Sequence, residues 1–171
     1  MTGFFFDDFE VGRVFTHSIR RTVTETDNVL FSTMTHNPAP LHLDHEYMRA
    51  QSEFGRPLVN SFFTLGLIVG MSIHETTLGT TVANLGLEEV RFPAPLFVGD
   101  TVHVETEVLA TRPSRSRPMN GILTLEHRGF NQHGVLIATC RRNVLMLREP
   151  PSAAGKVPSS ARSKARSKKR S

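Results

Sequence analysis

The sequence predicts a single α+β domain in which a curved antiparallel sheet wraps around one long apolar helix. Helix-like segments lie in the first half of the chain, including an apolar stretch at 62–73, and four segments with strand character follow. Helices that precede a run of strands are typical of a layered α+β architecture. The 171 residues suffice for one domain with a hydrophobic core, and no internal repeat indicates a second domain.

The first expected elements are a strand region and a capped helix. Residues 11–25 alternate in character and are rich in Thr, Val and Ile, which predicts one or two strands. Thr24 and Asp27 have the spacing of a capping box, in which each side chain binds the other residue's backbone N–H. This pair predicts a helix from Glu25 to about Met34.

A stiff loop and a second short helix are expected next. Pro38 and Pro40 cannot continue a helix, so the segment around them predicts a loop. Asp44 is a suitable N-cap for a helix that runs to about Glu53. The sequence Phe-Gly-Arg-Pro at 54–57 ends that helix.

The stretch 62–73 is apolar on nearly all sides, which predicts a helix that is buried throughout. Gly66 and Gly70 lie one turn apart on one face of this helix. They permit either a close approach of the sheet, which we favour, or room for an acyl chain.

Four strands complete the expected domain, because the remaining segments alternate or are rich in β-branched residues. They lie at 82–92, 100–111, 121–131 and 135–147. The sequence Asn-Gln-His-Gly at 131–134 predicts a hairpin turn between the last two strands.

The positive charge of the chain is concentrated at one end. The whole sequence carries 20 Lys/Arg and 16 Asp/Glu, whereas residues 148–171 alone hold eight Lys/Arg and one Glu. We therefore divide the chain into a domain, 1–148, and a basic tail, 149–171, whose composition predicts disorder. The tail is either an arm for a polyanion such as nucleic acid or a solubilising extension. We favour the extension and expect no nucleic-acid partner.

Cysteine content and hydropathy indicate the compartment. Cys140 is the single cysteine and lies in an apolar run, which favours a small core residue over a reactive thiol. We find no secretory signal and no apolar window of about 18 residues, so we expect a cytoplasmic protein without a membrane partner.

Several common kinds of site are absent from the sequence. It contains no glycine-rich phosphate loop, no paired cysteines and no Gly-x-Ser-x-Gly elbow. His42 and His45 lie close together, but no third ligand accompanies them, so we expect no metal.

His42 is the strongest candidate for chemistry, because an imidazole takes or gives a proton near neutral pH and the nearby prolines stiffen its loop. The alternative is that His42 only hydrogen-bonds the loop backbone. Asn37 lies in the same loop. Instead of taking part in chemistry, it could form an Asx turn before Pro38, in which its side chain binds the local backbone.

Three motifs resemble the MaoC-like hydratases, the (R)-specific enoyl-CoA hydratases of the hot-dog fold. The loop ends in Pro40-Leu41-His42, the apolar helix follows, and residues 92–101 match the family's strand-entry signature. Residues 114–122 and Asn131-Gln132 are most similar to the mesaconyl-CoA hydratase (β-methylmalyl-CoA dehydratase) branch. The resemblance covers about residues 5–148 and implies a hot-dog domain with hydro-lyase activity.

The resemblance also implies roles for residues near the loop. The family uses a loop His and a loop Asp to activate water, and the corresponding residues here are His42 and Asn37. An amide orients a water through its oxygen but cannot take its proton, which leaves His42 as the sole titrating group. At the start of the central helix, a family backbone N–H meets the thioester carbonyl. The matching positions imply Ser61 as that donor and Asn60 as a substrate-binding residue.

A CoA thioester substrate requires cations for its phosphates. Arg115 and Arg117 are the first candidates for binding these phosphates, and Arg91 is a weaker one. The alternative for each is that it is only a solvated charge in a loop. CoA belongs to the substrate, so no separate cofactor is expected. Hot-dog domains usually pair, so we expect a homodimer or a higher homo-oligomer by analogy.

The expected function is addition of water to, or its removal from, a short enoyl-CoA thioester, with or without a methyl branch. Two alternatives are open. One is a non-catalytic acyl-CoA-binding subunit in which the loop carboxylate was lost together with the chemistry. The other is a hot-dog acyl-CoA thioesterase.

Overall fold

The computed structural model describes residues 3–149, so the predicted basic tail from residue 150 onward lies outside the described residues. The first half of the chain contains η1 (Phe6–Asp8), β1 (Val14–Thr16), β2 (Arg21–Thr22), α1 (Glu25–Met34), α2 (Pro40–Leu43), α3 (His45–Gln51) and α4 (Ser61–Ile73). The second half contains β3 (Thr81–Arg91), β4 (Thr101–Pro113), β5 (Asn120–Phe130) and β6 (Leu136–Leu147).

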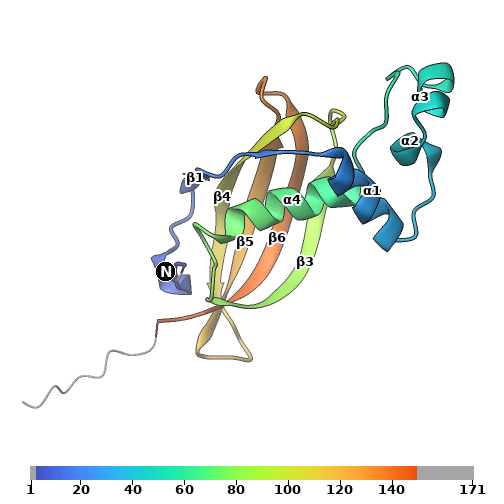
Figure 1. The fold of residues 1–171 in the computed structure, drawn as a ribbon. Helices are drawn as coiled ribbons and strands as arrows, with labels where there is room; N and C mark the ends of the chain where they lie inside the picture. The colour runs from blue at the N-terminus through green and yellow to red at the C-terminus, as the bar shows by residue number, and fades with distance from the viewer. Residues whose placement is uncertain (1–2, 150–171) are drawn as a thin grey trace, which may run out of the picture.

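The strands form one antiparallel sheet in the order β1-β4-β5-β6-β3, and β2 pairs with another part of β4. The sheet curves around α4, while α1, α2 and α3 project beyond one end of it (Figure 1). The predicted α+β architecture, a hot-dog arrangement, is therefore confirmed.

The elements with local sequence signals begin and end close to their predicted positions. The Thr24 N–H donates to Asp27 Oδ2 at 2.9 Å and the Asp27 N–H donates to Thr24 Oγ1 at 3.3 Å, which confirms the capping box of α1. Asp44 Oδ1 accepts from the Tyr47 N–H at 2.8 Å and caps α3. The turn at 131–134 joins β5 to β6 as expected.

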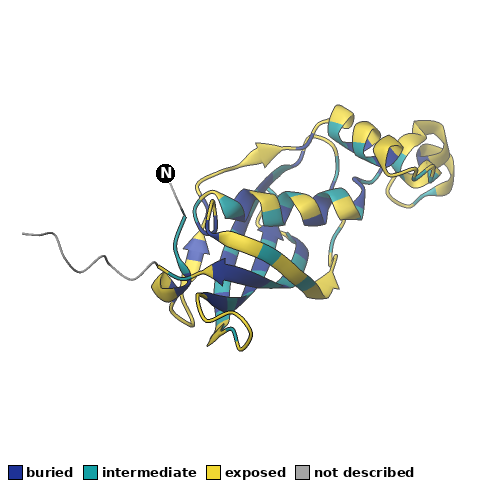
Figure 2. Ribbon diagram, turned by 90° about the horizontal axis from the view of Figure 1, so that it is seen from below, coloured by how far each residue is buried: buried dark blue, intermediate teal, exposed yellow. Residues whose placement is uncertain are grey.

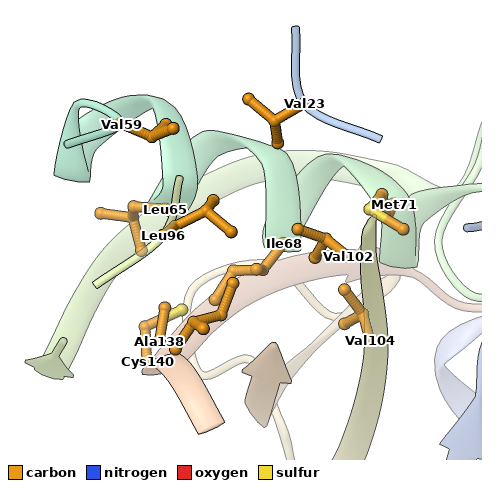
Figure 3. Packing of buried hydrophobic residues seen from close by; sticks show 11 residues of the cluster. Val23, Val59, Leu65, Ile68, Met71, Leu96, Val102, Val104, Ala138 and Cys140 are labelled. Carbon is orange, nitrogen blue, oxygen red and sulfur yellow. The ribbon is translucent and has the colours of Figure 1, made fainter. Parts of the chain in front are cut away.

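The core lies between α4 and the concave face of the sheet. Ile68, on α4, is fully buried and packs against Val102 and Val104 of β4 and against β6 (Figure 3). Cys140 of β6 is 1% exposed, and burial raises the pKa of its thiol to about 11. The prediction of an unreactive core cysteine is consistent with both observations.

The prediction that the central helix is buried throughout is wrong for this chain. The sheet covers only one side of α4, and Phe62 on the other side is 70% exposed (Figure 2). A Cβ built on Gly66 or Gly70 would meet no atom within 4 Å, so these glycines do not serve a close approach of the sheet. That approach occurs at Gly129 of β5, where a Cβ would lie 2.5 Å from the Ile68 Cγ2 atom.

Candidate active site

His42 lies on the single-turn helix α2, in a segment predicted as a loop. Pro40 occupies the first turn of α2, where a missing N–H removes no helical hydrogen bond and the fixed φ suits a helix. Prolines follow the end of α1 as expected, but a proline also fits the first turn of a helix, so the sequence did not indicate the short helix that starts at Pro40.

The His42 ring has a defined tautomer. Its Nδ1 atom lies 2.9 Å from the Leu58 carbonyl oxygen, which can only accept a hydrogen bond. Nδ1 therefore carries the hydrogen, and Nε2 keeps a lone pair with which it can accept a proton. The hydrogen bond from Nδ1 to the backbone therefore leaves Nε2 able to accept a proton.

Asn28 on α1 is a supporting residue that sequence reasoning missed. Its Nδ2 atom donates to the carbonyl oxygens of His42 at 2.9 Å and Leu58 at 3.1 Å, and its Oδ1 atom accepts from the Asn60 N–H at 2.8 Å. Asn28 is only 1% exposed. One buried amide thus ties α1 to α2 and to the start of α4.

A cavity of about 480 Å³ brings two of the predicted site residues together. Its polar side chains are His42, Ser61 and Thr64. The remaining wall is apolar and consists of Leu41, Phe54, Leu58, Val59, Phe92, Pro93, Ala94, Pro95, Leu96 and Ile137. A mostly apolar hollow with a few convergent polar groups is typical of a small-molecule site.

Ser61 is the first residue of α4 and lines this cavity. Asn60 Oδ1 caps the helix by accepting from the Phe62 N–H at 3.0 Å. Among the described residues, we find no acceptor for the Ser61 N–H. This N–H lies at the positive end of a 13-residue helix, where an oxygen with developing negative charge is stabilised.

Two other predicted site residues, Asn37 and Asn60, form hydrogen bonds within the protein. Asn37 Oδ1 accepts from the Ala39 N–H at 3.1 Å, which is the Asx turn, and Asn37 is not part of the cavity wall. Asn60 is 2% exposed, and its Nδ2 atom donates to Ser32 Oγ at 3.3 Å. Both ends of the Asn60 amide are thus engaged within the protein, and Asn60 is not part of the cavity wall. Its assignment to substrate binding stays a prediction.

The predicted arginines do not reach the cavity within one chain. Arg115 and Arg117 lie in the turn between β4 and β5, at the end of the sheet opposite to α2 and α3 (Figure 1). The 13 residues of β4 span about 40 Å at the usual rise per residue. Arg91 is exposed at the last position of β3 and is not part of the cavity wall.

The buried histidines belong to a separate polar row in the core. His127 Nδ1 lies 2.9 Å from Thr106 Oγ1, which also contacts His17 Nε2 at 2.8 Å. Burial, together with the nearby Arg142 cation, lowers the pKa of His127 to about 3. The ring is therefore neutral at neutral pH, and neither histidine is part of the cavity wall.

Residues 3–149 contain no group of three or more His, Cys, Asp or Glu side chains arranged to hold a metal ion. In the same part of the chain, no helix has the length and apolar character needed to cross a membrane.

The chain is similar in sequence to members of one protein family. Residues 8–129 match the family of MaoC-like domains. The mesaconyl-CoA hydratase of Cereibacter sphaeroides is 30% identical over 156 residues, which cover 91% of this chain and 45% of that protein. The chain thus spans less than half the length of this curated relative.

Two solved structures are similar over most of the chain. A MaoC-like dehydratase from Rhodospirillum rubrum is 31% identical with a TM-score of 0.75, covering 87% of this chain and 100% of the other. A conserved hypothetical protein from Mycobacterium tuberculosis, described as having a double hot-dog fold, is 25% identical with a TM-score of 0.78. The match covers 90% of this chain and 47% of that one.

Proposed function

The chain belongs to the family of MaoC-like domains, and on that premise we propose that it adds water to, or removes it from, a short 2-enoyl-CoA thioester. One observation carries the proposal: a histidine with a free Nε2 lone pair and an unbonded helix-start N–H share one apolar cavity. The similarity to a mesaconyl-CoA hydratase supports a short, methyl-branched acyl group among the substrates.

The geometry supports a mechanism with one titrating group. The thioester carbonyl accepts from the Ser61 N–H, and His42 Nε2 removes a proton from water as the water oxygen bonds to C3. The negative charge that develops on the thioester oxygen is stabilised by Ser61, and one such donor is typically worth about 2.7–4 kcal/mol. The protonated Nε2 then gives its proton to C2, which completes a syn addition.

Asn37 distinguishes this proposal from a non-catalytic acyl-CoA-binding subunit. Because a carboxylate at this position still accepts the Ala39 N–H, we expect Asn37→Asp to change kcat for crotonyl-CoA and mesaconyl-CoA by less than about tenfold. The loss of enoyl-thioester absorbance gives the turnover rate of the wild type and of the Asn37→Asp variant. An inactive wild type and an active Asn37→Asp variant would instead support the non-catalytic subunit.

A second copy of the chain completes the proposed assembly by pairing along β3. This strand is an edge of the sheet and exposes apolar side chains, among them Leu85 at 52%. A long apolar edge with unpaired backbone groups favours pairing with another strand. In support, the double hot-dog relative matches this chain over 47% of its own length.

Antiparallel pairing of the two β3 strands also concerns the predicted arginines. The β4–β5 turn lies at the end of the sheet where β3 begins, and the cavity lies where β3 ends. Antiparallel pairing would therefore bring the partner's turn, with its own Arg115 and Arg117, toward the cavity end of this chain. The two arginines thus stay candidates for the CoA phosphates only across the interface.

We expect sedimentation to give twice the 19.1 kDa mass at micromolar concentration, and Leu85→Glu to give monomers, because burying a charge against the partner strand is unfavourable. Met34→Glu, at a residue of α1 that is 72% exposed, is the matched control and should stay dimeric. A fully active wild-type monomer would contradict the pairing.

A further inference from the structure

Two further hollows adjoin the cavity of His42 and Ser61, and both are lined by Arg56. One, of about 220 Å³, shares His42 with the first cavity. The other, of about 570 Å³, shares Pro95 with the cavity of His42 and Ser61. It shares Arg56 and Val98 with the 220 Å³ hollow. The three hollows thus adjoin one another around the loop between β3 and β4.

Stacking holds the Arg56 guanidinium in place. Its Cζ atom lies 3.8 Å from the centroid of the Phe97 ring, and Phe97 in turn packs against Phe54 with centroids 6.2 Å apart. Other arginines of the described chain, such as Arg49, are paired with a carboxylate, but we find no carboxylate partner for Arg56 there. A stacked guanidinium keeps its in-plane N–H donors free for an anion.

The carboxylates that line the same two hollows are already engaged. Asp100, which is 8% exposed, accepts from Gln132 Nε2 and from the Phe97 N–H, each at 2.9 Å. Glu25 contacts His45 Nε2 at 2.9 Å. Arg56 is therefore the charged group of these walls that has hydrogen-bond donors available, and its charge suits an anionic ligand.

We propose that Arg56 binds a phosphate of the CoA portion of the substrate and that the 570 Å³ hollow receives that end of the molecule. This inference rests on the proposed CoA-thioester function. With the acyl group at His42 and Ser61, the pantetheine arm runs past Pro95 toward Arg56. The planar guanidinium can form two parallel hydrogen bonds to one phosphate, which a lysine cannot do.

Calorimetric binding of CoA itself tests the proposal without requiring turnover. Arg56→Gln should weaken CoA binding by about ten- to a hundredfold, since the variant loses charged hydrogen bonds. The affinity of Arg56→Lys for CoA should lie between that of the wild type and that of Arg56→Gln. Arg49→Gln, at an exposed arginine of α3 paired with Glu46, is the matched control and should bind as the wild type does. Thermal melting of each variant verifies its fold.

A second measurement separates phosphate binding from a general defect. Arg56→Gln should raise KM for crotonyl-CoA but leave KM for crotonyl-pantetheine, which lacks the phosphates, unchanged. An equal rise for both esters, or CoA binding as tight as in the wild type, would overturn the role of Arg56. Arg56-dependent CoA binding without any turnover would leave this role intact and contradict the hydratase proposal instead.

Discussion

Replacing His42 with alanine is expected to lower kcat/KM for an enoyl-CoA by about 10²–10⁴-fold, the usual contribution of a positioned acid–base group. The loss should be large because His42 is the only titratable side chain in the wall of the cavity that contains Ser61. No other side chain of that wall can replace Nε2 in taking the proton of water. The absorbance of the enoyl thioester provides the rate, and calorimetry with CoA should show binding unchanged.

His45→Ala is the control for this substitution. His45 lies three residues further along the chain, is 67% exposed and contacts Glu25. It lines the 220 Å³ hollow but is not part of the wall of the 480 Å³ cavity. Its removal should leave kcat/KM nearly unchanged. If His42→Ala retained most of its activity, or if His45→Ala lost as much, the assignment of the acid–base group to His42 would be wrong.

Replacing Asn28 with alanine is expected to lower both stability and turnover. The change removes three hydrogen bonds and leaves the carbonyls of His42 and Leu58 and the Asn60 N–H without this partner. The Leu58 carbonyl keeps its hydrogen bond from His42 Nδ1, so two groups lose their partner. Each group left unsatisfied costs about 1–3 kcal/mol, so we expect a loss of at least about 2 kcal/mol in the free energy of unfolding. Urea denaturation measures this loss.

The same substitution loosens the geometry between His42 and the start of α4. A displacement of about 1 Å in a catalytic constellation can cost about a hundredfold in rate, so kcat should fall although Asn28 is not part of the wall of the 480 Å³ cavity. Thr33→Ala, at an exposed residue of the same helix, serves as the control. Unchanged stability and kcat in Asn28→Ala would show that the amide does not position the site.

Elements with local signals were predictable from the sequence. The Thr24–Asp27 box and the Asp44 cap act within a single helical turn, so their residues alone determine where α1 and α3 begin. The strand pattern likewise indicated β3 to β6. His42 and Ser61 were named from motifs, and the structure brings both to one cavity.

Features that depend on distant contacts were not predictable in this way. Asn28 reaches residues 14 and 30 positions away along the chain, and nothing in its helix indicates those partners. The exposed side of α4 follows from how far the sheet curves around it. Arg56, read in the sequence only as part of a helix end, is significant because Phe97 from a remote loop stacks on it.

Addition of water across an enoyl thioester at His42 is tested most directly with isotopically labelled water. Wild-type protein is incubated with crotonyl-CoA or mesaconyl-CoA in H₂¹⁸O, and the products are analysed by mass spectrometry. We expect an intact CoA ester that carries ¹⁸O in a new hydroxyl group, and no label with His42→Ala. Label in a free carboxylate with release of CoA thiol would indicate a thioesterase, and unlabelled, unchanged ester would contradict catalysis altogether.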